Sequence, residues 1–311
     1  DPTLRIRKPF DPEKIKVRSE SRVVEQIISR IRHKEIDLAP DFQRLRGVWD
    51  TVRKSRLMES LLLRIPLPVF YVAADHNDNW SVVDGLQRMS TMFDFVTNEF
   101  VLERLEYLTN FDGCLFKELP RPMQRRINET QLLIHVIDPG TPEEVMFNIF
   151  SRINTGGVRL NGQEIRHALH KGPVRSFLKE LAGSEEFQRA TDHTVRSDRM
   201  ADRECVLRFL AFWLNPWETY SSSNLDGFLG STMKQLNGMS TLQRSQLKAD
   251  FERAMQAAYE IFEEDAFRKR YESGAGRNPV SKALFEAWSV ELGRRSDADL
   301  KKLVKRKARV G

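Results

Sequence analysis

The spacing of hydrophobic residues changes along the chain. In the first 140 residues, stretches with apolar residues at helical spacing alternate with short, continuous apolar runs. The first pattern predicts helices and the second predicts strands, and a polar turn at 75–79 between two of the runs is typical of a hairpin. The predicted elements are helices at 20–34, 50–64 and 86–96 and strands at 69–73, 80–83 and 132–137.

The strand pattern nearly disappears after residue 140. Thr141-Pro142 opens a helical pattern, and Asn161-Gly162-Gln163-Glu164 resembles a capping box at the start of another. Further helical patterns cover 200–214, 242–270 and 279–292. The sequence therefore predicts an α+β protein with a small α+β head at 1–140 and a mostly helical domain at 141–311 that ends in a basic tail.

The net charge of +6 is concentrated at one end of the chain. Residues 301–311 contain six Lys and Arg and no acid, so the remainder holds 44 basic and 44 acidic residues. Such a tail is typical either of a solvated helix end or of an arm that contacts phosphates. A second basic stretch lies near the N-terminus, and a local patch is enough to bind nucleic acid. The composition permits a nucleic-acid partner without requiring one.

Other features of the sequence narrow the class of protein. No apolar run approaches the ~20 residues of a membrane helix, and the start of the chain has no signal-peptide core, so we expect a cytoplasmic protein without a membrane partner. The two cysteines, Cys114 and Cys205, form no Cys-x-x-Cys pair, and Cys205 lies in an apolar helical stretch that predicts burial. His167 and His170 have no matching acid or histidine pair nearby, so we expect surface histidines rather than a metal site.

The first candidate site is the segment that joins the strand at 80–83 to the helix at 86–96. Asp84 and Gly85 form the turn, and Gln87 and Arg88 lie in the first turn of the helix. A carboxylate, an amide and a guanidinium would therefore lie at a helix N-terminus, where free backbone N–H groups favour an anion. The alternative is structural, with Asp84 as a turn or capping residue and Arg88 as a surface cation.

Two further polar segments resemble the first. Gln43-Arg44 is a second Gln-Arg pair in a loop before a helix, and Arg152, Asn154 and Thr155 precede Gly156-Gly157. The glycines permit close approach of a ligand, but they are equally typical of a turn that ends a helix. No Walker loop occurs in the sequence, which excludes the ordinary NTPase architecture. A charged stretch at 198–204 is expected to form exposed i, i+4 ion pairs.

Together the motifs resemble those of a known family. In chain order they are Pro40-x-Phe42-Gln43-Arg44, Trp49, Ile65-Pro66-Leu67-Pro68, Val83-Asp84-Gly85-Leu86-Gln87-Arg88, Phe150-x-Arg152-Ile153-Asn154-Thr155-Gly156-Gly157-x-x-Leu160-x-x-Gln163-Glu164-Ile165-Arg166 and Asp202-x-Glu204-x-Val206-Leu207-Arg208-Phe209. The chain is similar to the N-terminal domain family of GmrSD-type modification-dependent restriction systems. This family is related to the ParB and sulfiredoxin-like fold, which the resemblance implies for the head.

The resemblance implies a nucleotide-using domain in bacterial DNA defence. In the family, an Asp-Gly-Gln-Gln-Arg signature is associated with binding and hydrolysis of nucleoside triphosphates. Asp84 would bind Mg²⁺ or orient water, and Asp84, Gln87 and Arg88 would be the catalytic residues. Phosphate contacts would come from Gln87, Arg88 and Arg44. The resemblance extends the nucleotide-binding set to Gln43, Arg44, Gly85, Arg152, Asn154, Thr155 and Gly156.

The chain departs from the family pattern in two places. Leu86 replaces the first glutamine of the signature, which places hydrolysis in more doubt than binding, and restoring Gln should raise turnover only if hydrolysis is the function. Family members often carry a histidine-containing nuclease domain, whereas this sequence ends in a basic tail. Any DNA cleavage would therefore come from a separate nuclease subunit or from sequence outside this chain.

The leading hypothesis is an Mg²⁺-dependent NTPase that acts as sensor or regulator in a DNA-restriction or anti-phage system. Its expected partners are DNA, including modified DNA, a separate nuclease subunit and, in a homo-oligomer, further copies of the chain. The alternative is a non-catalytic DNA-binding adaptor that uses a ParB-like head and the basic ends. Direct nuclease activity of the head has least support, because the sequence shows no clustered metal-binding carboxylates.

Overall fold

The chain forms two compact units, which are described separately. The first comprises Asp1–Asn161 and the second Gly162–Gly311, so this division lies later in the chain than the expected boundary at residue 140. The computed structural model describes residues 16–38, 49–153, 161–220, 224–269 and 277–307. A mixed sheet in the first unit and helices in both units confirm the α+β class.

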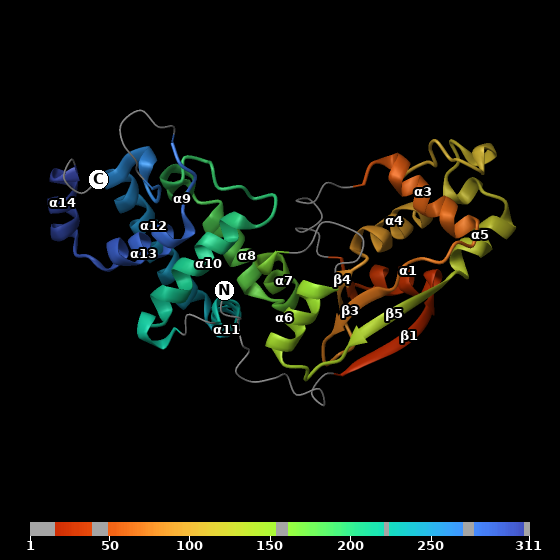
Figure 1. The fold of residues 1–311 in the computed structure, drawn as a ribbon, viewed down its shortest axis with the longest axis horizontal. Coiled ribbons are helices and arrows are strands. Elements are labelled where there is room, and N and C mark those ends of the chain that lie inside the picture. Colours follow the sequence, from red (N-terminus) through yellow and green to blue (C-terminus); the bar gives the residue numbers. More distant parts are fainter. Residues whose placement is uncertain (1–15, 39–48, 154–160, 221–223, 270–276, 308–311) are drawn as a thin grey trace, which may run out of the picture. The chain divides into compact units, whose positions relative to one another are not determined.

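The first unit is built on one mixed sheet (Figure 1). The strand order is β1 (Val17–Val23), β5 (Gln131–Ile137), β3 (Phe70–Ala74), β4 (Trp80–Asp84) and β2 (Ile36–Asp37). The pairs β1–β5 and β3–β4 are antiparallel, whereas β5–β3 and β4–β2 are parallel. The expected hairpin at 69–83 and the strand at 132–137 are both present.

Helices cover one face of this sheet. The first unit contains α1 (Val24–Arg32), α3 (Thr51–Leu62), α4 (Leu86–Val96), α5 (Arg121–Asn128) and α6 (Glu143–Arg152). Figure 1 shows α1, α3, α4 and α5 on one side of the strands, and α4 packs against both α1 and α3. Along β5, Leu132, Ile134 and Val136 are buried while Leu133 is 47% exposed. The alternation follows from the two-residue period of a strand with one covered face.

One predicted element is wrong in its first part. The helix expected at 20–34 begins only at Val24, because residues Val17–Val23 form strand β1. This strand pairs with β5 along its whole length, from Val17 opposite Ile137 to Val23 opposite Gln131. The pairing satisfies backbone groups that a helix would otherwise have satisfied internally.

A buried acid stabilises the first unit. Glu59 of α3 is 3% exposed, and its carboxylate accepts hydrogen bonds from the backbone N–H groups of Glu106, Tyr107 and Leu108 at 2.7–3.1 Å. Burial raises the pKa of Glu59, but these three donors and Arg56 outweigh it and hold the pKa below its ordinary value. Glu59 therefore attaches the loop at 106–108 to α3.

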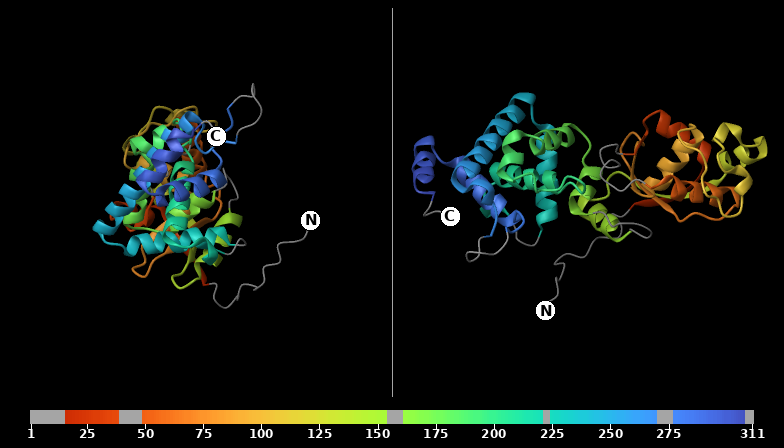
Figure 2. Two further views of the ribbon diagram at one scale, coloured as in Figure 1. Left: turned by 90° about the vertical axis from the view of Figure 1, so that its left-hand side faces the viewer. Right: turned by 90° about the horizontal axis from the view of Figure 1, so that it is seen from above.

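The second unit is helical (Figure 2). Its helices are α7 (Gly162–Leu169), α8 (Pro173–Ala182), α9 (Glu185–Ala190), α10 (Ala201–Leu214), α11 (Leu225–Gly238), α12 (Thr241–Phe262), α13 (Lys282–Arg294) and α14 (Asp297–Lys305). Short 3₁₀ turns occur at Thr109–Phe111 and Phe116–Glu118 in the first unit and at Trp217–Thr219 and Glu263–Asp265 in the second. The core contains Phe187, Phe209, Phe251 and Phe285, with ring centroids of contacting pairs 5.1–6.0 Å apart.

Two expectations about polar side chains of the second unit are wrong. The stretch at 198–204 does not form only exposed ion pairs, because Asp202 and Arg203 are 7% and 5% exposed. His167 and His170, expected at the surface, are 2% and 6% exposed. Helix packing buries these residues, and no group of three or more His, Cys, Asp or Glu in the described residues is arranged to hold a metal ion. Cys205 is buried as expected, and burial raises the pKa of its thiol to about 12.

Candidate functional site

The segment Asp84–Arg88, here called the α4 corner, joins β4 to α4. Gly85 is the N-cap of α4 and has φ +94°, a backbone conformation that residues other than glycine rarely adopt. A Cβ added to Gly85 would overlap Cδ1 of Phe70 and would lie 2.8 Å from its Cε1 and 3.1 Å from Nη2 of Arg88. Both the backbone conformation and the packing therefore require glycine at this position.

Arg88 connects the α4 corner to the segment before β3. Its guanidinium donates hydrogen bonds to the carbonyl oxygens of Pro68 and Val69 and, at 3.2 Å, to Oδ2 of Asp84. It also lies over the Phe70 ring, with Cζ 4.1 Å from the ring centroid. Burial lowers the pKa of Arg88, and the charge of Asp84 opposes this shift. Arg88 is therefore a structural clamp, and its bonds to the described residues leave its Nε–H and one Nη1–H for another acceptor.

The amide nitrogen of Gln87 has no hydrogen-bond acceptor among the described residues. This atom, Nε2, is buried. Leaving a buried donor unsatisfied costs about 1–3 kcal/mol, so such a group indicates an acceptor that comes from elsewhere. Gln87 lies in the first turn of α4, where backbone N–H groups have no intrahelical partner. The α4 corner therefore presents hydrogen-bond donors of two kinds at one helix end.

Asp84 is the acidic group of the corner, and its ion pair with Arg88 bears on metal binding. Magnesium usually keeps several waters and binds one or two carboxylates together with phosphate oxygens of a nucleotide. A single carboxylate that is 17% exposed and already paired with Arg88 fits that mode, but it does not fit a metal centre built from protein ligands alone. Asp84 would be the protein ligand, with the phosphates supplying the remainder.

Leu86 and Arg152 occupy different kinds of environment. Leu86, which replaces a glutamine of the family signature, is 6% exposed and belongs to the apolar face of α4 with Met89 and Met92. Arg152 is exposed in the last turn of α6, where a cation complements the helix dipole. The predicted site residues Gln43, Arg44, Asn154, Thr155 and Gly156 lie outside the described residues.

The sequence did not reveal the role of Phe70 or of the carbonyl groups of Pro68 and Val69. The two carbonyl groups fix the orientation of Arg88, and the Phe70 ring leaves no room for a Cβ at position 85. The only sequence signal was the Ile65-Pro66-Leu67-Pro68 segment, which predicted the end of a helix but not a hydrogen-bonding partner.

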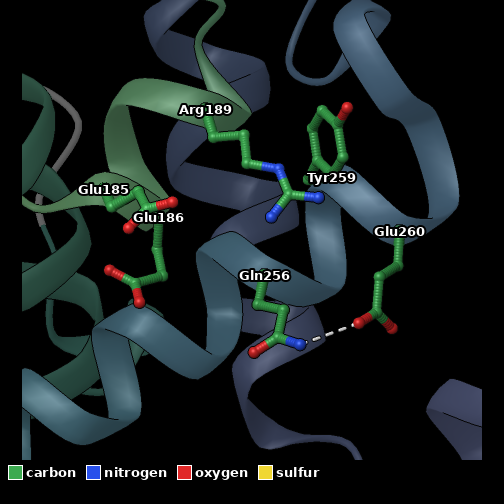
Figure 3. Close-up of a pocket in the computed structure, with 6 residues that line it drawn as sticks. All are labelled: Glu185, Glu186, Arg189, Gln256, Tyr259 and Glu260. Carbon is green, nitrogen blue, oxygen red and sulfur yellow. Dashed lines mark hydrogen bonds between the residues drawn. The ribbon is translucent and has the colours of Figure 1, made fainter.

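A pocket in the second unit has different chemistry. Figure 3 shows it between α9 and α12, lined by Glu185, Glu186, Arg189, Gln256, Tyr259 and Glu260. Arg189 lies 4.3 Å from the centroid of the Tyr259 ring, and Gln256 donates to Glu260 at 2.9 Å. Its volume of about 190 Å³ is below the ~300 Å³ of a typical ligand pocket, and three acids against one arginine disfavour a phosphate. The size and charge of this pocket therefore disfavour a nucleotide.

Comparison with known proteins identifies the first part of the chain. No curated protein and no solved structure matches the chain. None of the helices in the described ranges combines the length and apolar character needed to cross a bilayer. Residues 24–171, which include the α4 corner, match the family described as "GmrSD restriction endonuclease, N-terminal domain". Residues 24–171 therefore form a domain of the GmrSD N-terminal domain family, which implies a component of a restriction or defence system.

Proposed function

We propose that the first unit binds a nucleoside triphosphate with Mg²⁺ at the α4 corner and acts as a sensor or regulator of its restriction system. The observation that carries the proposal is the buried Nε2 of Gln87, which has no acceptor in the described structure and lies at the N-terminal end of α4. A phosphate oxygen supplies such an acceptor, and a helix N-terminus favours its negative charge. The match of residues 24–171 to a restriction family supports a DNA partner, including modified DNA.

Each group of the corner has a distinct part in this proposal. Gln87 and the first-turn N–H groups bind phosphate oxygens, and Arg88 adds the two N–H groups that its clamp does not use. Asp84 holds Mg²⁺, which neutralises phosphate charge when bound. By the family resemblance, Gln43, Arg44, Arg152, Asn154, Thr155 and Gly156 belong to the same nucleotide-binding set.

Hydrolysis is a second, separable part of the proposal. Asp84 would orient the attacking water, and Gln87 and Arg88 would stabilise charge that develops on the phosphates. Turnover should then disappear in Asp84→Ala and in Arg88→Ala. Arg125→Ala is the control, because Arg125 forms the same i, i+4 kind of ion pair with Glu129 at an exposed site. Nucleotide binding without turnover in the wild type would restrict the function to sensing.

The test of binding is a thermal-shift panel of nucleotides with Mg²⁺ on the wild type and on Gln87→Met. Without nucleotide, Gln87→Met should be as stable as the wild type or more stable, because it removes a buried donor that lacks an acceptor. With nucleotide at about 100 times Kd, the wild type should gain about 2.7 kcal/mol and the variant much less. Gln131→Met, at an exposed site on β5, makes the same chemical change and should keep the full gain. Equal gains in all three proteins would refute the assignment.

Helix α14 supports a second candidate, a DNA-binding adaptor. Its apolar residues Leu300, Leu303 and Val304 pack on the core of the second unit, while Lys301 and Lys305 are exposed. The exposed cations of an ordered helix are available to phosphates. If they bind DNA, Lys301→Gln/Lys305→Gln should reduce the slope of log K against log salt by about 2, since each lost phosphate contact contributes about 0.9. An unchanged slope would remove α14 from the interface.

A further inference from the structure

The start of α7 in the second unit contains an unusual glutamine. Gln163 is fully buried, and its Oε1 accepts a hydrogen bond of 2.9 Å from Nε of Arg166. Since Nε of arginine can only donate, this bond fixes which end of the amide is the oxygen. The other end, Nε2, is buried and has no acceptor in the described part of the chain. Among the described residues, Gln163 is therefore a second glutamine with an unsatisfied amide nitrogen, away from the α4 corner in sequence and in the other unit.

Arg166 adds a buried positive charge beside this amide. It is 2% exposed, and its Nη1 donates to Oδ1 of Asp226 at 2.6 Å. Burial lowers the pKa of Arg166, the charges of Asp226 and Glu204 oppose that shift, and Arg208 reinforces it. The net lowering means that the nearby acids do not fully compensate for the loss of hydration. A further anion would stabilise this guanidinium.

The backbone at the start of the helix lies against the same ion pair. A Cβ added to Gly162 would lie 3.2 Å from Nη1 of Arg166 and 3.2 Å from Oδ1 of Asp226. Gly162 is the first residue of α7, so the backbone N–H groups of the first helical turn begin beside the guanidinium. The helix end, the guanidinium and the unsatisfied amide all favour an oxyanion.

Asp226 differs from the other groups because it is accessible. Its side chain is 53% exposed, whereas that of Arg166 is 2% exposed. Asp226 lies in the first turn of α11, so movement of its carboxylate into solvent requires no change in the core of the unit. Asp226 is therefore suited to compete with an added anion for the guanidinium of Arg166.

From these contacts we propose that the N-terminal end of α7 binds a phosphate group, which displaces Asp226 from Arg166. Gln163 contributes its unsatisfied Nε2–H groups, and Arg166 contributes the N–H groups released by Asp226. The site uses residues of the second unit alone and does not depend on nucleotide binding at the α4 corner.

The test is calorimetric titration of the full chain with inorganic phosphate at constant ionic strength. All proteins carry Gln87→Met, so that the α4 corner contributes little to the signal. Asp226→Asn removes the competing charge and should tighten phosphate binding roughly tenfold, equivalent to about 1.4 kcal/mol. Asp297→Asn is the matched control, because Asp297 is an exposed acid paired with Arg253 at 2.8 Å in the same unit. The phosphate affinity of this variant should equal that of the parent.

A second variant tests the amide. Gln163→Glu keeps an acceptor for Nε of Arg166, so the unit should remain folded, but it replaces the free donor by a negative oxygen. Phosphate binding should fall at least tenfold while helical circular dichroism stays unchanged. Absence of phosphate binding in both the parent and Asp226→Asn would overturn the proposal, as would equal affinities of Gln163→Glu and the parent.

Discussion

Replacing Gly85 by alanine should destabilise the first unit through two separate effects. The backbone has φ +94° at this position, and holding an L-residue in the left-handed region costs about 1–2 kcal/mol. The added Cβ would also overlap Phe70, whose ring is fully buried and lies under the guanidinium of Arg88. Because the ring is fully buried, overpacking should add about 1–3 kcal/mol. We expect a total of about 2–5 kcal/mol for Gly85→Ala.

Gly113→Ala separates the two effects. Gly113 has φ +83°, but a Cβ there would meet nothing within 4 Å. This variant should therefore lose only the conformational part, about 1–2 kcal/mol. The difference between the two alanine variants measures the steric contact with Phe70.

Amide hydrogen exchange is the suitable assay, because a chain with two units does not guarantee a single unfolding transition. Protection of peptides from β4 and α4 gives the free energy of opening of the first unit alone. In a double-mutant cycle, Phe70→Leu should relieve part of the cost of Gly85→Ala, with a coupling energy of about 1–3 kcal/mol. The reasoning is refuted if Gly85→Ala is no worse than Gly113→Ala, or if the cycle shows no coupling.

Three shorter predictions concern other buried groups. Glu59→Gln should cost about 2–3 kcal/mol of unfolding free energy at neutral pH. The pKa of folded Glu59 lies below its ordinary value of 4.5, so the stability that its carboxylate contributes is present above that pH and is lost as the pH falls. Urea melts of the two proteins should therefore converge in acid. Leu86→Gln should cost about 2–3 kcal/mol by burying an amide on the apolar face of α4, and a parallel NTPase assay decides whether turnover rises despite this cost. Thiol alkylation of the native protein should modify Cys114, which is partly exposed, and leave Cys205 unmodified until the second unit opens; equal rates would contradict its burial.

The local pattern of hydrophobic residues was sufficient to predict an element where that element has a distinct hydrophobic face. Helix α4 was predictable because Leu86, Met89 and Met92 recur at helical spacing on its buried side. Strand β1 was not predictable in this way. It is an edge strand with polar residues between Val17 and Val23, and its strand conformation depends on pairing with β5 more than 100 residues later. Nothing in the segment itself distinguishes it from the start of the helix that follows.

Burial of charge also depends on distant parts of the chain. Glu204 and Arg208 are spaced as a surface i, i+4 pair, and they do bond at 3.0 Å. They are nevertheless mostly buried, because Lys282 and Glu286 of α13 supply a second ion pair for each of them. A sequence shows the spacing within one helix but not the helix that will cover it.

In the α4 corner, too, local contacts could be predicted from the sequence and distant contacts could not. Asp84, Gln87 and Arg88 lie within five positions of one strand–turn–helix segment, so their proximity could be predicted from local structure alone. The partners of Arg88 could not, since the carbonyl groups of Pro68 and Val69 come from the segment before β3. Because of these hydrogen bonds, Arg88 is not only a candidate ligand-binding residue but also a residue that stabilises the first unit.

The two proposed sites share a physical arrangement that explains why each should respond to phosphate. In each unit an arginine with a lowered pKa is paired with an aspartate, Arg88 with Asp84 at 3.2 Å and Arg166 with Asp226 at 2.6 Å. In each, a glutamine of the same helix carries a buried Nε2 that has no acceptor in the described structure. An internal aspartate offsets part of the cost of burying each arginine, but no acceptor in the described residues satisfies these two amide donors, which an external oxygen could do. The stability of each unit should therefore increase with phosphate independently of the other, because each has its own aspartate and its own donor.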